Sequence, residues 1–225
     1  MKKTLFIILA LTLLFSTTSF AAITEWRVSW TPAEKQKLHD NISQHMNQQW
    51  IPVGLSGRNN QIFILYVKNP NNTLGIRRWS LNWYKNINAL RAGLTTRLNN
   101  GYLPMGMTYY RNMVWVFYVQ GRIRSSGWKI VNAEPNAVEL RSKINGLIEM
   151  GYFPVDITIV DGQFVILAIN DPSARNMTWI IKKHSNKTNL FRSQVTTMVN
   201  QRWVPYTFTY HLNNIFIFYF KHRGQ

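Results

Sequence analysis

Residues 151–158, Gly-Tyr-Phe-Pro-Val-Asp-Ile-Thr, decide the fold, because three further versions of this stretch occur in the chain. In each version an aromatic residue stands two positions before a proline. The pairs are Trp50/Pro52, Tyr102/Pro104, Tyr152/Pro154 and Trp203/Pro205, and successive prolines lie 52, 50 and 51 residues apart. Self-similarity at a fixed period of this length is typical of repeat proteins. The sequence therefore predicts four copies of one structural unit.

Upstream of each of these aromatic residues, apolar side chains recur every fourth position. Residues four apart lie on one face of an α-helix, so each repeat is predicted to contain an amphipathic helix with this stripe in the core. Residues 31–34 read as a capping box that begins the first helix, and Glu134-Pro135 as the start of the third. The stripes are Leu38/Ile42/Met46, Leu90/Leu94/Leu98, Leu140/Ile144/Ile148 and Phe191/Val195/Val199. The helices are expected to end at Gln49, Gly101, Gly151 and Arg202. Glycine at two of these positions suits a left-handed C-cap, and the proline three residues later forbids continuation of the helix.

Three strands are predicted around each helix. A tryptophan strand precedes the helix, and a proline strand follows it with small and polar residues on alternate positions, which is typical of a half-buried strand. A turn rich in Asn, Gly and Asp then leads into an apolar strand, which suits the middle of a sheet. The tryptophan strands are expected at residues 26–30, 79–83, 128–132 and 179–183, and the apolar strands at 62–67, 114–119, 164–169 and 215–220.

The predicted fold class is α+β, with four βαββ repeats of about 51 residues. Each sheet is expected to join a proline strand, its apolar strand and the tryptophan strand of the next repeat. This leaves residues 26–30 and 215–220 without partners, and pairing them would close a propeller-like ring of three-stranded sheets with helices between them. An open solenoid is the alternative. The repeats span approximately residues 23–70, 76–121, 127–171 and 177–222 of one domain, residues 22–225.

The motif at residues 151–158, with its turn and apolar strand, resembles the bacterial tandem-repeat module built on a Gly-Tyr-Arg-Pro core. That module occurs beside serine hydrolase domains such as those of polyglycine hydrolases. The resemblance covers the helix end and hairpin of every repeat, and it implies a non-catalytic repeat domain. The chain departs from the module by having Ile51, Leu103, Phe153 and Val204 in place of its arginine, and Gln49 and Arg202 in place of its glycine.

Residues 1–21 are predicted to be a signal peptide. Lys2 and Lys3 precede a short apolar run, and Ser19-Phe20-Ala21 is a small-x-small cleavage site. The run is shorter than the roughly 20 residues that a membrane span needs, so no span is expected after cleavage. We therefore expect an exported protein, periplasmic or extracellular. The chain has no cysteine, so neither disulfides nor thiol chemistry are available to it.

Charge is the strongest compositional signal. The chain carries 26 Lys and Arg against nine Asp and Glu, a net charge of +17. Most of these cations have no carboxylate to pair with, which favours a polyanionic partner such as nucleic acid, acidic polysaccharide or envelope phosphates. Several lie near the tryptophan strands, and a basic rim interleaved with aromatics is the predicted polyanion-binding site. Its residues are Arg77, Arg78, Arg122, Arg124, Lys129, Arg175, Lys182 and Lys183.

Ser126 and Lys129 match the Ser-x-x-Lys pattern of the serine hydrolases beside which the module occurs, but that chemistry needs the pair one turn apart on a helix and here it enters a strand, so the match is interpreted as chance. No other familiar catalytic or metal-binding motif occurs in the sequence, so no enzyme activity, cofactor or metal is expected. Asp156, Asp161 and Asp171 gather in the third repeat, where turn and strand-end aspartates are the usual explanation. The favoured hypothesis is an exported, non-enzymatic polyanion-binding protein. One alternative is a repeat module that docks on a secreted protein partner, and the less favoured one is an enzyme with an unfamiliar site around Asp156.

Overall fold

The computed structural model describes residues 25–68, 75–122, 124–211 and 213–222, so the expected signal peptide lies outside the described residues. These residues form four successive units of one helix and three strands, which confirms the α+β repeat. The first two units are β1 (Trp26–Pro32), α1 (Lys35–Asn47), β2 (Trp50–Arg58), β3 (Gln61–Lys68) and β4 (Arg78–Tyr84), α2 (Ile87–Asn99), β5 (Tyr102–Tyr110), β6 (Met113–Gln120). The last two are β7 (Trp128–Ala133), α3 (Ala137–Glu149), β8 (Tyr152–Val160), β9 (Gln163–Asn170) and β10 (Met177–Ser185), α4 (Thr188–Asn200), β11 (Val204–His211), β12 (Asn214–His222).

Each unit forms its own antiparallel sheet, with the apolar strand in the middle as predicted. The strand orders are β1-β3-β2, β4-β6-β5, β7-β9-β8 and β10-β12-β11. The expectation that a sheet borrows the tryptophan strand of the next repeat is wrong, and so is the pairing of residues 26–30 with 215–220. Trp26 lies opposite Val67 of its own repeat, and β12 pairs with β10 and β11. Because β1 and β2 both run antiparallel to β3, the unit is a split β-α-β crossover rather than a meander.

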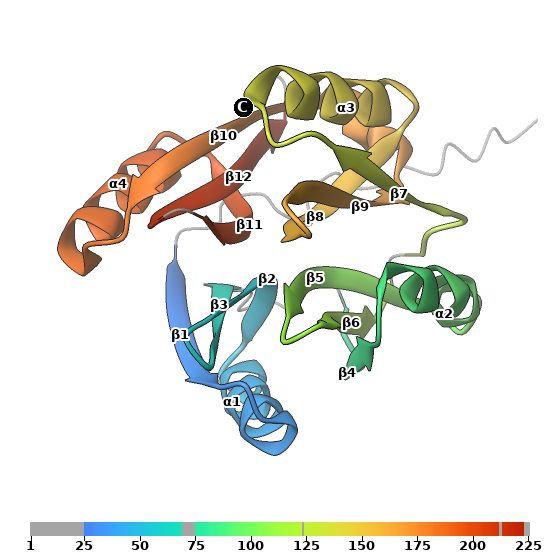
Figure 1. Cartoon of the computed structure of the whole chain (residues 1–225), viewed down its shortest axis with the longest axis horizontal. Helices are drawn as coiled ribbons and strands as arrows, with labels where there is room; N and C mark the ends of the chain where they lie inside the picture. The colour runs from blue at the N-terminus through green and yellow to red at the C-terminus, as the bar shows by residue number, and fades with distance from the viewer. Residues whose placement is uncertain (1–24, 69–74, 123, 212, 223–225) are drawn as a thin grey trace, which may run out of the picture.

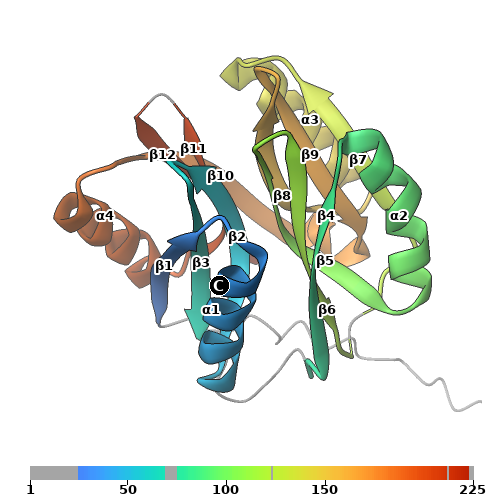
Figure 2. The ribbon, with the colours of Figure 1, turned by 60° about the horizontal axis from the view of Figure 1, so that its bottom comes forward.

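The first three helices connect neighbouring repeats, because each of them contacts the tryptophan of the strand that begins the next repeat. The His39 ring of α1 lies 4.7 Å from the Trp79 ring, between ring centroids. The Trp128 indole donates a hydrogen bond to Thr95 of α2, and the Trp179 indole donates one to Asn145 of α3, both at 3.1 Å. Neighbouring repeats therefore meet through helix contacts where a shared strand was expected. Figures 1 and 2 show these helices on the outside of the molecule.

The ends of the helices follow the prediction, but two of the starts do not. Gln49, Gly101, Gly151 and Arg202 all have positive φ, between 65° and 80°, immediately before the proline strands. Strand β1 extends through Pro32, so the predicted capping box is absent, and α1 begins only after Glu34. Helix α3 begins at Ala137, where the Asn136 side chain accepts a 2.8 Å hydrogen bond from the Glu139 N–H. The N-cap of α3 is therefore Asn136, whose side-chain oxygen accepts from the backbone, and the helix begins after the predicted start at Glu134-Pro135.

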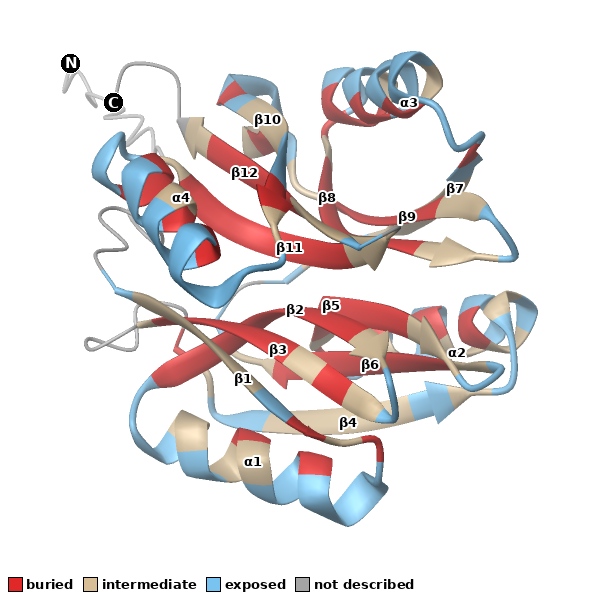
Figure 3. Cartoon of the chain, turned by 60° about the vertical axis from the view of Figure 1, so that its left-hand side comes forward, coloured by how far each residue is buried: buried red, intermediate tan, exposed pale blue. Residues whose placement is uncertain are grey.

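The proline strands β2, β5, β8 and β11 lie at the middle of the molecule and are buried along most of their length (Figures 1 and 3). β2 contacts β5, β5 contacts β8, β8 contacts β11, and β11 contacts β2. The proline strands were expected to be half-buried, with their small and polar positions on the less buried face, and that expectation is wrong. Those positions, Gly54/Ser56, Gly106/Thr108, Asp156/Thr158 and Thr207/Thr209, are buried between the sheets.

Hydroxyl side chains of the proline strands link one sheet to the next. Thr108 Oγ1 accepts a 3.1 Å hydrogen bond from the Gly57 N–H, and Thr158 Oγ1 accepts one of 3.2 Å from the Tyr109 N–H. Ser56 Oγ accepts a 3.0 Å bond from the Tyr210 N–H, which links the last repeat to the first. A buried backbone donor without a partner is costly, so these hydroxyls replace the strand partners that the inner edges lack.

Substituting Gly54 by Val is expected to destabilise the protein by about 1–3 kcal/mol, because the centre has no room for a side chain. A Cβ at Gly54 would lie 3.0 Å from the Phe208 nitrogen and 3.0 Å from the Thr207 Cα, both backbone atoms. The matched control is Gly146→Ala in α3, where nothing lies within 4 Å of the added atom. It should stabilise the protein by up to about 1 kcal/mol. Urea unfolding measures both, and a Gly54→Val variant of wild-type stability would contradict this packing.

Candidate functional site

The eight predicted rim residues are spread over different parts of the molecule. Arg77 and Arg78 stand exposed where the chain enters β4, whereas Lys182 and Lys183 stand exposed in the second half of β10. Trp79 and Trp179 occupy the same position in their repeats. Arg78 precedes Trp79 by one residue, whereas Lys183 follows Trp179 by four. These two pairs therefore lie at opposite ends of the outer strands, and their role as a common binding rim stays a prediction.

Arg122, Arg124 and Arg175 belong to the segments that connect one repeat to the next, and the side chain of each lies beside a glycine. Arg175 Nε donates a 3.0 Å hydrogen bond to the Glu149 carbonyl at the end of α3. The Arg124 guanidinium lies beside Gly101, which follows α2, and the Arg122 side chain lies beside Gly75. Cations are favourable at helix C-termini, where carbonyl groups lack intrahelical partners. Arg175, and by position Arg124, therefore have a structural use in addition to any ligand.

Lys129 belongs to a feature that the sequence analysis missed. Its ammonium lies 4.8 Å from the centroid of the Tyr152 ring, the aromatic residue two positions before Pro154. The equivalent aromatic residue is covered by a cation in every repeat, a contact worth about 0.5–1 kcal/mol at exposed sites. The other pairs are Arg27 and Lys68 over Trp50, Arg97 over Tyr102, and Lys221 over Trp203, at 4.1–5.6 Å. Part of the basic surface thus stabilises the repeat motif itself.

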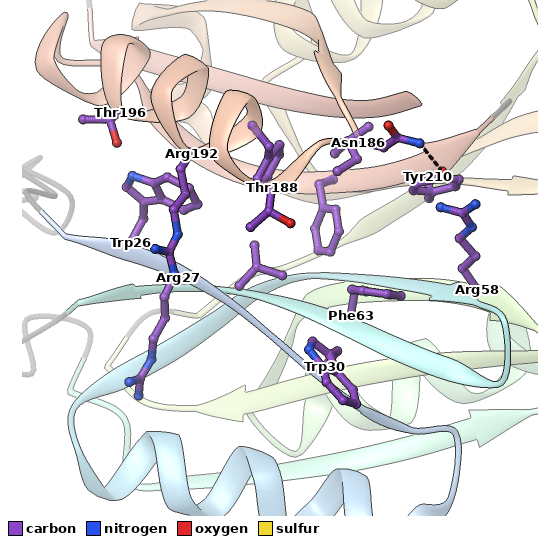
Figure 4. A pocket seen from close by; sticks show the side chains of 14 residues that line it. Trp26, Arg27, Trp30, Arg58, Phe63, Asn186, Thr188, Arg192, Thr196 and Tyr210 are labelled. Atoms are coloured by element: carbon purple, nitrogen blue, oxygen red, sulfur yellow. Dashed lines mark hydrogen bonds between the residues drawn. The ribbon is translucent and has the colours of Figure 1, made fainter. Parts of the chain in front are cut away.

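A cavity of about 630 Å³ lies between the first repeat and the last. It is bounded by β1 and β3 on one side and by α4, β11 and β12 on the other (Figure 4). Volumes of roughly 300–1,000 Å³ are typical of ligand sites in proteins. The lining residues are Trp26, Arg27, Val28, Trp30, Arg58, Phe63, Asn186, Thr188, Phe191, Arg192, Thr196, Phe208, Tyr210 and Ile215. We call this cavity the 1–4 groove.

The 1–4 groove combines apolar walls with arginine side chains. Figure 4 shows Arg58 near one end and Arg192 near the other, with Phe63 and Trp30 between them. The Arg58 guanidinium stacks 3.8 Å from the Tyr210 ring centroid, and the Trp30 side chain is 58% exposed. Arg27 points away from the groove, over Trp50, and burial lowers its pKa. Among the described residues that line the groove there is no Asp or Glu, so its electrostatic potential favours anions.

The equivalent space between the third and fourth repeats is closed. A void of about 30 Å³ remains there, lined in part by Leu140, Ile157 and Phe164. Fifty-one residues later in the sequence, the same repeat positions are Phe191, Phe208 and Ile215, which line the 1–4 groove. Phe191 and Phe208 are larger than their counterparts, so smaller side chains at these two positions do not open the groove.

Asp156 occupies the centre of the molecule and is completely buried. Its carboxyl group accepts hydrogen bonds from the Met107 and Ile157 N–H groups and from the Thr207 hydroxyl, and so joins β5, β8 and β11. Burial raises the pKa of Asp156 to about 8, against the opposing effect of these hydrogen bonds. A raised pKa in itself suits a general acid or base. A group with no access to solvent or substrate serves structure, and this arrangement favours a structural role.

The three aspartates of the third repeat do not form a site together. Asp161 lies in the exposed β8–β9 turn, and Asp171 caps the short 3-10 helix Pro172–Asn176 by accepting a 3.0 Å bond from the Ser173 N–H. Within the part of the chain that the structure describes, no group of three His, Cys, Asp or Glu side chains could hold a metal ion. None of the helices in that part has the length and hydropathy that a membrane crossing requires.

Comparison of the chain with models of known protein families finds no match. Comparison with curated protein sequences likewise finds no significant relative.

Proposed function

We propose that the protein is an exported, non-enzymatic binding protein, and that the 1–4 groove is where it engages a polyanion such as nucleic acid, an acidic glycan or envelope phosphates. The net charge of +17, which becomes +15 once Lys2 and Lys3 are removed with the signal peptide, supports a polyanionic partner in general, because it draws anionic polymers to the surface. Charge alone does not favour one place on the surface over another, so the groove carries the specific part of the proposal.

The single observation that carries the proposal is the composition of the groove. Guanidinium groups of Arg58 and Arg192 stand beside aromatic side chains, without a carboxylate among the described lining residues. Guanidinium groups bind phosphate and sulfate with two hydrogen bonds, and aromatic side chains add stacking or apolar contact. The equivalent junction between repeats three and four is closed, so the groove is not a general consequence of the repeat.

The proposal also covers the arrangement of the four repeats and the family to which the repeat is related. The first is that the four units act as one propeller-like ring, which the succession of contacts among β2, β5, β8 and β11 supports. The second is that the repeat is related to the tandem-repeat module found beside serine hydrolase domains, which the motif at residues 151–158 supports. That relationship also implies the alternative function, in which the module docks on a secreted protein partner.

A fluorescence titration with heparin and with labelled single-stranded oligonucleotide, at several salt concentrations, tests the proposal. For the oligonucleotide, log affinity should fall linearly with log salt, by roughly 0.7 per phosphate contact. The double variant Arg58→Gln/Arg192→Gln should make this slope shallower by on the order of one unit. The control Arg111→Gln/Arg141→Gln removes equal charge outside the groove: Arg111 binds Asn60 in a hairpin turn, and Arg141 is the repeat equivalent of Arg192 on α3.

The control double variant should leave the slope close to the wild-type value. Equal weakening by both pairs would mean that the attraction is a general effect of net charge, which would contradict a site in the groove. The pair Arg122→Gln/Arg124→Gln tests the predicted rim in the same way. If the wild-type protein binds neither polymer at low salt, the polyanion proposal is wrong and protein docking becomes the better hypothesis.

A further inference from the structure

The walls of the 1–4 groove differ from those of a surface that binds only a charged polymer. Val28 and Phe63 line it from the first repeat, and Phe191, Phe208 and Ile215 line it from the last. Phe191 and Phe208 are buried, and Val28, Phe63 and Ile215 are partly buried against the same core. The groove therefore has a continuous apolar floor, which water solvates poorly and an apolar ligand would cover.

The cations of the groove stand around this floor. Arg58 is positioned by the Tyr210 ring and by a 3.2 Å hydrogen bond from its Nη2 to Asn213 Oδ1. A guanidinium group has five N–H donors, so Arg58 keeps donors for a ligand. Among the residues that the structure describes, none forms an ion pair or accepts a hydrogen bond from Arg192. The groove thus offers an unpaired cation beside an apolar surface.

From this juxtaposition we propose that the groove binds an anionic amphiphile, with a single alkyl chain on the apolar floor and a phosphate-type head group at Arg192. The inference rests on the proposed anion binding in the groove and narrows its ligand to the lipid-phosphate class. Aliphatic Val28 and Ile215 have no π-face for a base to stack on, whereas methylene groups pack against them and against the phenylalanines alike. Trp30 and Thr188, at the exposed side of the groove, would border the chain.

Isothermal titration calorimetry with octyl, decyl and dodecyl phosphate, each below its micelle-forming concentration, tests the proposal. Affinity should rise with chain length by up to about fourfold for each added methylene, because burying one methylene contributes about 0.8 kcal/mol to the binding free energy. Inorganic phosphate, which lacks the chain, and dodecyl maltoside, which lacks the charge, should each bind at least about tenfold more weakly than dodecyl phosphate. The chain-length series measures the contribution of the apolar floor to affinity. Inorganic phosphate and dodecyl maltoside measure the contributions of the charge and of the alkyl chain separately.

Two variants locate the binding. Arg192→Gln should weaken dodecyl phosphate by about tenfold, since charge-assisted hydrogen bonds contribute most to anion binding, while the equivalent Arg141→Gln on α3 should leave it unchanged. Thr188→Trp should fill the entrance and abolish binding of the longest chain. Thr188 is exposed at the start of α4, so this variant should fold, and circular dichroism verifies that.

Other outcomes would overturn the inference in distinguishable ways. If heparin or oligonucleotide binds through Arg58 and Arg192 but alkyl phosphates show no dependence on chain length, the amphiphile is wrong while anion binding in the groove stands. If a mononucleotide binds more tightly than dodecyl phosphate, a base occupies the groove. If the free protein is a dimer that Thr188→Trp converts into a monomer, a second copy of the chain covers it. If no anion binds, both proposals fail.

Discussion

Replacing Asp156 by Asn is expected to make the stability of the protein much less dependent on pH, because the wild-type protein should lose stability as pH rises. The pKa of Asp156 is raised to about 8 in the folded protein, against 3.8 for the exposed group. Between these values the folded protein keeps a proton that the unfolded chain has released, so stability falls as pH rises. At 1.36 kcal/mol per pKa unit the loss amounts to about 5 kcal/mol between pH 4 and 8.

The pH range above about 6.5 isolates this effect. Burial lowers the pKa values of His45 and His184, so those groups destabilise the fold as pH falls below about 6.5 and oppose Asp156 there. Between about pH 6.5 and 8, the wild type should lose on the order of 1.5 kcal/mol, and Asp156→Asn should lose much less. Urea unfolding at four or five pH values measures this, and parallel curves for the two proteins would show that Asp156 does not titrate in this range.

Truncating Ile144 to Ala is expected to cost about 2–5 kcal/mol, and truncating Leu140 a similar amount. Both belong to the buried stripe of α3, where Ile144 has no exposed surface and Leu140 is 6% exposed. Deleting their methyl groups loses transfer free energy and leaves a cavity that close-packed neighbours do not fill. Leu140 borders the small void between repeats three and four, so its loss would also open the junction that is now closed.

Val138 supplies the matched control on the same helix, because its side chain is 81% exposed. Val138→Ala should change the free energy of unfolding by less than about 0.5 kcal/mol, and the better helix propensity of Ala acts in its favour. Chemical denaturation of the three variants compares the positions directly. Equal, small losses at Ile144 and Val138 would mean that the stripe does not form the core.

Local features of each repeat could be predicted because they depend on neighbours in sequence. Spacing of four residues placed Leu90, Leu94 and Leu98 on one helix face, and all three are buried. Gly101 and Gly151 predicted a left-handed helix end, and Gln49 and Arg202 adopt the same conformation although neither is glycine. The helix starts were less predictable, since Pro32 can begin a helix or end an edge strand, and only its pairing with Gln61 decides for the strand.

The candidate site could be predicted only in its chemistry. Excess cations and interleaved aromatic residues indicated an anionic ligand, but the eight rim residues were chosen by their closeness in sequence to the tryptophan strands. The 1–4 groove joins Trp30 and Phe63 of the first repeat to Arg192 and Tyr210 of the last. Residues so far apart in the chain leave no local pattern from which the groove could be predicted.

The sequence by itself determined the number of repeats, the type and order of their elements, the buried helix stripe and the central place of the apolar strand. These follow from local periodicity, turn residues and burial on both faces, which act within a few residues of each position. Tertiary structure decided which strand completes each sheet, because β1 and the next tryptophan strand β4 offer similar edges to β3. It also decided that the small residues of the proline strands lie between sheets, where Gly54 admits the backbone of β11 and Asp156 joins three strands. Small and polar residues suit either solvent or a crowded centre, so only the packing of the other repeats distinguishes the two.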